Sequence, residues 1–256
     1  MEPETHCAVV TGGESGIGRA TALALARVGH PVALTYHSDA AAGAAVVAEI
    51  EQAGGRALAC QVDVADEAAV DALFVAAERA FGPVRLLVNS AGVNMRGTPL
   101  AEMPLAQFTG VLGADLVGPF LTCRRFVRGL AARGGGRIVN VSSIHERAPR
   151  AGGADYDSAK GGLAQLTATL ALELAPQRIA VNAVAPGMIL TPMNKSALDD
   201  PDELRSKEAA IPWGRAGMAE EVAVLIVFLL SVEADYLTGA TVTIDGGLSL
   251  TVAQGA

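Results

Sequence analysis

The stretch Thr11-Gly12-Gly13-Glu14-Ser15-Gly16-Ile17-Gly18 decides the fold of this chain. It follows an apolar run at residues 7–10 of the kind that fills a buried parallel strand, and a helical pattern runs from residue 17 to residue 29. Glycines let the main chain approach a ligand closely, and the free N–H groups and dipole at a helix start attract phosphate. Plain turns and helix caps also carry glycine patterns, but the place between a strand and a helix favours a cradle for the pyrophosphate of a dinucleotide.

A second motif, Tyr156 with Lys160, lies downstream of Ser143. The pattern from 155 to 175 is helical, so these two side chains share one face and the ammonium group lies near the phenol. A free tyrosine titrates near pH 10, but a cation about 4 Å away favours its phenolate by roughly 4 kcal/mol at an effective dielectric of 20. Tyr156 is therefore predicted to exchange a proton with a substrate oxygen near neutral pH. The alternative interpretation is a solvated lysine beside a buried tyrosine.

Strand-like apolar runs alternate with helical patterns along the whole chain. Strands are expected at residues 7–11, 32–36, 57–61, 85–89, 137–142, 179–185 and 241–244, with helices between most neighbours. This alternation predicts an α/β fold, a doubly wound (Rossmann) parallel sheet of about seven strands with helices on both faces. No repeat or composition break marks a second domain, so residues 1–256 are expected to form a single dinucleotide-binding domain. Within it, the polar segment 188–211 is predicted to be a mobile lid over the substrate, and an ordinary solvated loop is the alternative.

Together these motifs resemble those of the short-chain dehydrogenase/reductase family, and the resemblance covers essentially the whole chain. It includes Thr-Gly-x3-Gly-Ile-Gly at 11–18, Asp63-Val64, Asn89-Ser90-Ala91-Gly92, Ser143, Tyr156 with Lys160, and Pro186-Gly187 before Thr191. The resemblance implies an NAD(P)-dependent oxidoreductase that transfers a hydride between a nicotinamide and a secondary alcohol or carbonyl. The catalytic residues it implies are Ser143, Tyr156, Lys160 and, with a departure, Asp115. The cofactor-binding positions are Gly12, Ser15, Gly16, Ile17, Gly18, Tyr36, His37, Ser38, Asp63, Val64, Asn89, Ala91, Gly92, Tyr156, Lys160, Pro186, Gly187, Ile189 and Thr191.

Two positions depart from the family pattern. The usual second Asn of the Asn-Asn-Ala-Gly turn is Ser90, and the catalytic Asn of a distorted helix is Asp115. In the family, that Asn holds a water that passes protons from the lysine to solvent. A carboxylate accepts from such a water but cannot donate as an amide does, and its charge opposes the field of Lys160. We expect the relay to survive, with Tyr156 acting at a higher pH.

The residues after the second predicted strand address the choice of cofactor. An NAD-selective site places a carboxylate about twenty residues past the glycines to accept from the ribose 2′-hydroxyl, and here that position is Tyr36. The following His37 and Ser38 supply neither that acid nor the Arg of many NADP-selective relatives, and Asp39 is explained as a helix cap. The sequence leans slightly to NADP, with dual use of NAD and NADP open.

The substrate is indicated by resemblance. The residues after Ser143, the stretch 191–194 and the end of the chain are similar to those of bacterial glucose 1-dehydrogenases, so a sugar or polyol is the first expectation. Its candidate contacts are Ser143, His145, Glu146, Asn94 and Met193. The alternative for His145 and Glu146 is that they form a pair on the surface of the loop and contact no substrate. Reduction of a 3-oxoacyl thioester on acyl-carrier protein is the rival, supported by Arg96, Arg147 and Arg150 near the site. Another class, a nicotinamide-binding sensor without turnover, rests on the departure at position 115 alone.

Composition limits the possible partners. A formal net charge of −8 argues against nucleic acid or an anionic membrane surface as a partner, because like charges repel. The longest apolar run is too short for a membrane span and no leader pattern opens the chain, so a cytoplasmic protein is expected. The three isolated cysteines are read as small buried hydrophobes rather than metal ligands, and no metal is expected. The helix after Lys160 is apolar on more faces than one sheet covers, and with the family resemblance this predicts a homotetramer.

Overall fold

The computed structural model describes residues 5–94, 96–130, 135–194 and 199–253. Seven strands form one parallel sheet in the order β3-β2-β1-β4-β5-β6-β9. They are β1 (Cys7–Val10), β2 (Val32–Tyr36), β3 (Ala57–Gln61), β4 (Val84–Asn89), β5 (Gly136–Val141), β6 (Ile179–Pro186) and β9 (Thr241–Ile244). The doubly wound sheet expected from the alternation of apolar runs is confirmed.

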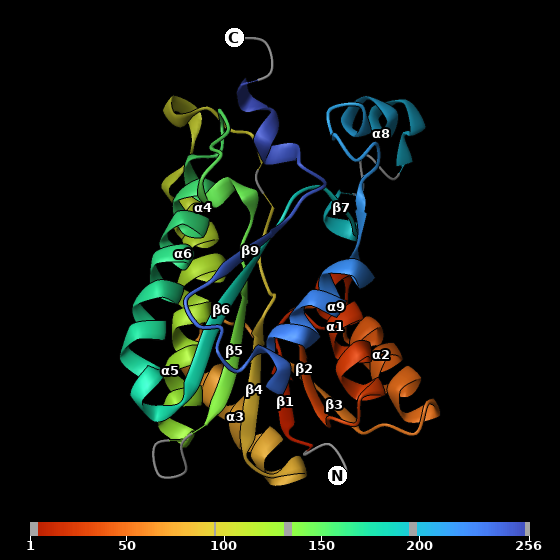
Figure 1. Cartoon of the computed structure of the whole chain (residues 1–256), viewed down its shortest axis with the longest axis vertical. Helices are drawn as coiled ribbons and strands as arrows, with labels where there is room; N and C mark the ends of the chain where they lie inside the picture. The colour runs from red at the N-terminus through yellow and green to blue at the C-terminus, as the bar shows by residue number, and fades with distance from the viewer. Residues whose placement is uncertain (1–4, 95, 131–134, 195–198, 254–256) are drawn as a thin grey trace.

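Helices cover both faces of the sheet (Figure 1), and along β1 alternate residues pack on opposite layers. Ala8 and Val10 of β1 join a core with helices α1 (Gly16–Arg27), α2 (Ala40–Gln52) and α9 (Ala219–Leu229). The neighbouring Cys7 and Val9 join a second core on the other face. The helices of that second core are α3 (Glu67–Phe81), α5 (Gly118–Leu130) and α6 (Ala154–Leu174), and α4 (Leu105–Leu112) packs beside α6. Because both faces are covered, the strands consist mostly of apolar residues.

Carboxylates begin two of these helices. The Asp39 side chain accepts a hydrogen bond from the Ala42 N–H at 2.9 Å, so Asp39 is the N-cap of α2, as expected. Asp66 accepts from the backbone N–H of Ala68 at 2.8 Å and so caps α3. Both caps satisfy amides that have no partner inside the helix.

The strand order reverses between β1 and β4, and there the chain ties the two strand ends together. The Thr11 hydroxyl oxygen accepts from the backbone N–H groups of Ser90 and Ala91, both at 3.0 Å. Gly12 adopts φ +63°, and a Cβ at this position would lie 2.9 Å from the Ala91 Cα. Parallel sheets bind ligands outside the carboxyl ends of the strands at such a reversal, so this edge is where a site is expected.

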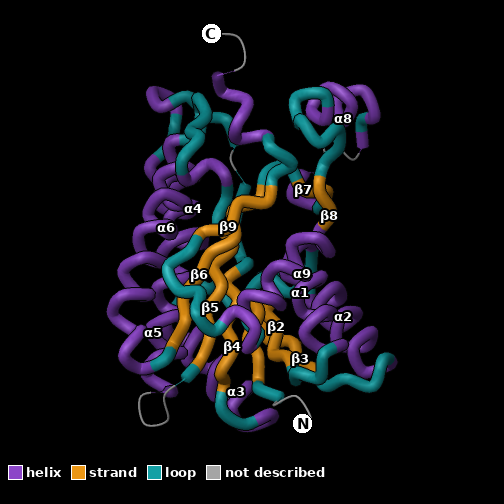
Figure 2. The backbone as a smooth tube through the Cα atoms, viewed as in Figure 1, coloured by secondary structure: helices purple, strands orange, loops and turns teal. Residues whose placement is uncertain are grey.

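The chain between β6 and α9 stands apart from the main sheet (Figure 2). Two short strands, β7 (Ile189–Leu190) and β8 (Gly217–Met218), pair with each other, and α8 (Pro201–Glu208) lies between them in sequence. The predicted lid, 188–211, therefore contains β7 and α8, while its residues 195–198 lie outside the described part of the chain. Its mobility and the single-domain assignment stay predictions.

One helical stretch, Leu105–Leu130, is long and apolar enough to span a membrane by length and composition alone. Its second half is α5, which packs Leu121, Phe126 and Leu130 into the second core, on the face of the sheet that α3, α5 and α6 cover. Core helices of globular proteins pass the same test, so the stretch is weak support for a membrane span.

Candidate active site

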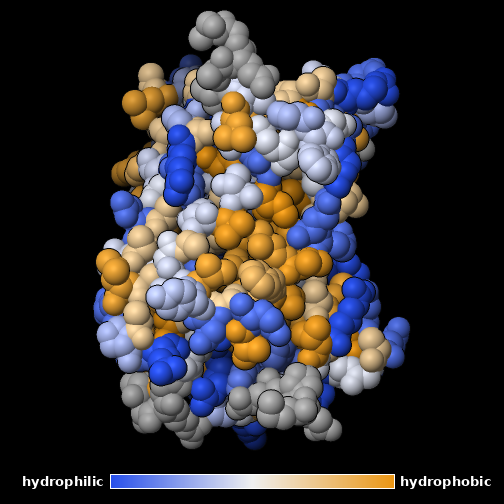
Figure 3. Space-filling model, viewed as in Figure 1, coloured by the Kyte–Doolittle hydropathy of each residue, from blue (hydrophilic) through white to orange (hydrophobic). Residues whose placement is uncertain are grey.

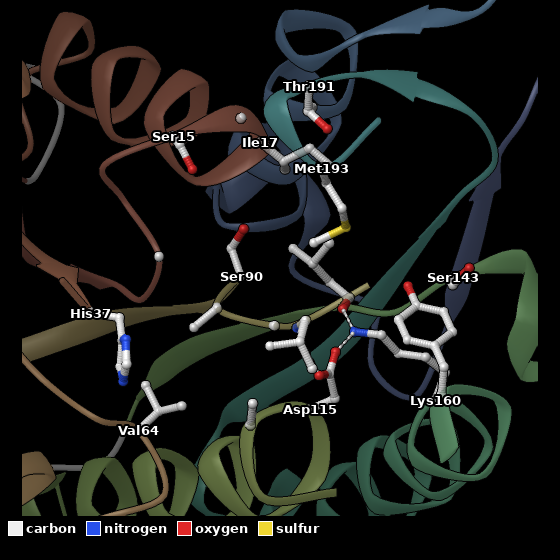
Figure 4. A pocket seen from close by; sticks show the side chains of 18 of the residues that line it. Ser15, Ile17, His37, Val64, Ser90, Asp115, Ser143, Lys160, Thr191 and Met193 are labelled. Carbon is white, nitrogen blue, oxygen red and sulfur yellow. Dashed lines mark hydrogen bonds and ion pairs between the residues drawn. The ribbon is translucent and has the colours of Figure 1, made fainter. Parts of the chain in front are cut away.

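A cavity of about 630 Å³ opens at the carboxyl edge of the sheet, beside the reversal of strand order (Figure 4). Most residues expected at the site line it. They are Gly12, Ser15, Gly16, Ile17, His37, Asp63, Val64, Ala91, Gly92, Asp115, Ser143, Tyr156, Lys160, Pro186, Gly187, Ile189, Thr191 and Met193. The glycine turn and the Tyr–Lys motif, far apart in the sequence, thus face one space.

The glycine turn forms one wall of the cavity. Ser15 is the N-cap of α1 but makes no capping bond with its side chain, and Ser15, Gly16 and Ile17 all line the cavity. A side chain on Gly18 would collide with the Gly12 carbonyl, which explains the tight join of strand and helix. Because the first amides of a helix need outside partners and its N-terminal dipole favours anions, this wall fits a pyrophosphate.

Tyr156, Lys160 and Ser143 converge at the opposite end of the cavity. The Lys160 Nζ lies 5.4 Å from the centre of the Tyr156 ring and donates to the Val141 carbonyl at 3.0 Å. Ser143 Oγ accepts from the backbone N–H of His145 at 3.2 Å, so the hydroxyl proton is free for another acceptor. All three residues are buried.

The start of α6 is fixed by a carboxylate next to the tyrosine. Asp155 is fully buried, and its Oδ1 accepts from the Tyr156 N–H at 2.8 Å. Its Oδ2 accepts from the Gln107 side chain of α4, also at 2.8 Å. Asp155 therefore ties α4 to the turn of α6 that carries Tyr156.

Asp115 pairs directly with the lysine. It lies in a π-helical turn, Gly113–Val117, between α4 and α5, and its Oδ1 is 3.0 Å from Lys160 Nζ. Its Oδ2 accepts from the Val93 N–H at 2.9 Å, and a Cβ on Gly92 would lie 2.5 Å from Oδ1. Burial alone would lower the pKa of Lys160, but the Asp115 carboxylate, with a smaller contribution from Tyr156, raises it above its ordinary value. The lysine is therefore held as a cation.

Four expected cofactor contacts lie outside the cavity lining: Gly18, Tyr36, Ser38 and Asn89. The Tyr36 ring packs over Gly43 of α2, where only glycine leaves room for it. Asn89 belongs to a buried network in which its amide donates to Asn140 Oδ1 at 2.9 Å and its oxygen accepts from the Thr122 hydroxyl at 2.6 Å. The Asn89 side chain thus joins β4, β5 and α5, a contact that the sequence motif alone does not reveal.

Three expected substrate contacts also lie outside the lining and are engaged elsewhere. Glu146 is 2% exposed and accepts from the Ser142 hydroxyl at 2.7 Å. The His145 Nδ1 lies 2.8 Å from the Ala148 carbonyl oxygen, to which it can only donate. Asn94 donates to the Met193 carbonyl at 3.0 Å, so it supports the loop that brings Met193 to the cavity.

Several lining residues had no role assigned from the sequence, among them Glu14, Thr35, Thr109, Ser142 and Asn194. Glu14 stands inside the glycine motif, and a carboxylate within a phosphate cradle is the signal that could have marked it. The Glu14 Oε2 is buried and has no hydrogen-bond partner among the described residues. In the described part of the chain, no group of three or more His, Cys, Asp or Glu is arranged to hold a metal.

The chain is similar to known proteins along nearly its whole length. A family model described as enoyl-(acyl carrier protein) reductase matches residues 12–249. The chain is 41% identical over 243 residues to 3beta-hydroxysteroid dehydrogenase 1 of Eggerthella lenta, covering 94% of this chain and 93% of that protein. It is 36% identical over 249 residues to glucose 1-dehydrogenase 2 of Bacillus subtilis, covering 96% of each. A crystallised variant of a Serratia marcescens short-chain dehydrogenase/reductase superposes with a TM-score of 0.90 at 35% identity, covering 97% of this chain and 100% of that one.

Proposed function

Because the chain belongs to the short-chain dehydrogenase/reductase family of NAD(P)-dependent oxidoreductases acting on CH–OH and C=O groups, we propose that Tyr156 is its general acid/base. The observation that carries this assignment is the convergence of Tyr156, Lys160 and Ser143 at one end of a cavity whose other wall is an open helix N-terminus. Proton exchange by a side chain in the cavity is the part of the reaction that the protein itself must supply.

The dinucleotide fits the residues present. The glycine turn and the start of α1 would hold its pyrophosphate, the Asp63 side its adenine, and Thr191 its nicotinamide end. The bound nicotinamide would supply the hydride acceptor for oxidation and the donor for reduction.

The proton is handled by this chain's own residues. In oxidation, the Tyr156 phenolate would take the proton of the substrate hydroxyl, and in reduction the Tyr156 O–H would donate to the carbonyl oxygen. Ser143, whose oxygen already accepts from the His145 N–H, is left to donate to that same substrate oxygen. Lys160 favours the phenolate by its charge, and Asp115 beside it moderates that charge.

For the substrate, we favour a secondary alcohol or ketone on a mainly apolar body. The lining of the cavity includes the apolar side chains Val93, Ala106, Ala114 and Met193. Three of its polar side chains, Thr109, Ser142 and Asn194, already donate within the protein, to Leu105, Glu146 and Ile189. An apolar wall with few free donors favours a substrate like that named for the hydroxysteroid dehydrogenase relative over the sugar or polyol expected from the sequence.

The sugar remains the second candidate, because a glucose 1-dehydrogenase is among the relatives. Initial rates with a 3-hydroxysteroid and with D-glucose, each with NAD and with NADP, separate the two. Turnover of glucose alone would overturn the apolar assignment. Reduction of a 3-oxoacyl thioester would instead support that substrate. The exposed arginines Arg96, Arg147 and Arg150 would then be the candidates for binding the phosphate of the carrier.

The central test is Tyr156→Phe. It removes the hydroxyl and keeps the ring that packs near Lys160, so kcat should fall by at least roughly 1,000-fold while binding of the reduced dinucleotide, read by its fluorescence, stays near that of the parent. Full activity in this variant would overturn the assignment of Tyr156. Dinucleotide binding without turnover of any alcohol or ketone by the parent would instead support the sensor. The cytoplasmic location stays a proposal, and the homotetramer is proposed from the apolar faces of α6 together with the family resemblance.

A further inference from the structure

The cavity is unevenly charged along its length. Figure 4 shows Ser15, His37 and Val64 at one end and Ser143 and Lys160 at the other. The charged and titratable side chains of the described lining are Glu14, His37, Asp63, Asp115, Tyr156 and Lys160. The described lining therefore has a single ammonium or guanidinium group, and it lies at the catalytic end.

The carboxylates of the lining differ in the hydrogen-bond donors and cations that they contact. Asp63 accepts from the Ala65 N–H at 2.9 Å, and Asp115 has the Val93 N–H and the Lys160 ammonium. Glu14 has a buried Oε2 with no hydrogen-bond partner among the described residues. Burying a carboxylate oxygen without a hydrogen-bond donor costs free energy, so we expect a bound molecule to donate a hydrogen bond to this atom.

Glu14 adjoins the capping Ser15 of α1, and so it belongs to the end of the cavity away from Tyr156. With a pyrophosphate held at the start of α1 and the nicotinamide half beside Tyr156, the adenosine half lies on the Glu14 side. The adenosine ribose of NAD offers hydroxyl donors there, whereas the 2′-phosphate of NADP offers negative charge and no donor.

Among the described residues that line the cavity, no lysine or arginine lies at that end to offset a phosphate. Arg19, one turn into α1, forms an ion pair with Glu49 of α2 on the protein surface and does not line the cavity. His37 lines the cavity at that end and is the only basic side chain that the described lining places there. A 2′-phosphate would therefore face the Glu14 carboxylate without compensation from a lysine or arginine of the described lining.

We propose that Glu14 reads the adenosine ribose of the cofactor, accepting from its hydroxyls and excluding a 2′-phosphate, so that the enzyme selects NAD over NADP. This assignment rests on the proposed function and replaces the slight lean to NADP drawn from the sequence. This acid stands within the glycine turn itself, whereas the position expected for an acid in an NAD-selective site is Tyr36, the last residue of β2.

The test is direct binding of NADH and NADPH to the full chain at pH 8, by titration of nucleotide fluorescence. The parent should bind NADH roughly 100-fold more tightly than NADPH, because like charges at a cavity wall repel strongly. In Glu14→Gln, which keeps size and an acceptor oxygen, NADPH affinity should rise at least about tenfold and NADH affinity should change less than about threefold.

A matched control is Asp39→Asn, which removes one negative charge near the same sheet edge but outside the lining and leaves a good N-cap on α2. It should keep the parent's preference. If Asp39→Asn reduced the preference for NADH over NADPH as much as Glu14→Gln does, the role of Glu14 would be overturned. The same follows if the parent binds NADPH as tightly as NADH. Binding of neither nucleotide would overturn the proposed function as well, so the two failures are distinct.

Discussion

At the scale of single residues, the ion pair of Asp115 and Lys160 is the main departure from the family pattern. The two side chains are 1% and 6% exposed and lie 3.0 Å apart. A carboxylate this close cancels much of the attraction that the ammonium would exert on the Tyr156 phenolate.

Replacing Asp115 by Asn should therefore move the pH–rate profile. Asn keeps the acceptor for the Val93 N–H and removes the charge, so the limb on which oxidation rises with pH should shift to lower pH by about one unit. The measurement is kcat/KM for alcohol oxidation against pH. Asp66→Asn, at the cap of α3, serves as a charge control and should leave the limb in place. An unmoved limb in Asp115→Asn would show that the pair does not tune Tyr156.

The residues of the site were predicted unevenly from the sequence, for a physical reason. Spacing places the backbone, so Tyr156 and Lys160, four apart on one helix, meet as predicted. Spacing does not choose rotamers in loops. Glu146 was expected to reach a substrate, but the Ser142 hydroxyl, four residues before it, captures its carboxylate.

At the scale of elements, the strands were predictable because most of them are apolar runs, and the central strands β1, β4, β5 and β6 are largely buried on both faces. β7 and β8, two residues each, carry no periodic signal and were not predicted. The π-helical turn at Gly113–Val117 was expected only through the resemblance, because its residues look helical by composition. It matters because it brings Asp115 to Lys160.

The contact between α4 and α6 should control the placement of Tyr156. Asp155→Ala leaves the half-buried Gln107 amide and the buried Tyr156 N–H without their acceptor, which should lower the free energy of unfolding by about 2 kcal/mol. It should also reduce kcat more than it raises KM, because Tyr156 loses its fixed position. Asp155→Asn keeps one acceptor oxygen and should recover part of both effects. Chemical denaturation and initial rates measure them, and an alanine variant as stable as the parent would contradict this role.

At the scale of the whole molecule, two buried thiols link stability to alkaline pH. Burial, as the largest cause, raises the pKa of Cys7 and of Cys123 to about 12, from an ordinary value of 9.0. Above pH 9 the unfolded chain ionises these thiols while the folded chain does not, so unfolding releases protons and stability falls as pH rises toward 12. Each thiol should cost about 1.4 kcal/mol per pH unit in that range and nothing below pH 8.

Denaturant midpoints of the parent and of the double variant Cys7→Ala, Cys123→Ala, measured between pH 8 and pH 11, test this linkage. The double variant should be less stable at pH 8, because it loses buried side chains, and the gap should narrow as pH rises. A gap independent of pH would contradict the linkage.

The homotetramer is a prediction at the same scale, and the surface offers the two separate contacts that a tetramer with twofold axes requires. On α6, Leu172 is 82% exposed, and on α9, Val224 and Phe228 are 69% and 43% exposed. Figure 3 shows hydrophobic side chains gathered in the centre of one face, between β9 and α9. Because α6 and α9 cover opposite faces of the sheet, one copy cannot use both surfaces on the same neighbour.

Each of the two subunit contacts should therefore be disrupted by its own substitution. A charge at Leu172 or at Val224 opposes burial of that surface alone, so Leu172→Glu and Val224→Glu should each reduce a tetramer to dimers, and the double variant should be a monomer. Light scattering at matched protein concentration gives the masses, and circular dichroism confirms that each variant is folded. Val75→Glu, at an exposed position of α3, is the control and should keep the parent's mass. A parent mass equal to one chain would contradict the tetramer, and a monomer from either single variant would contradict two independent contacts.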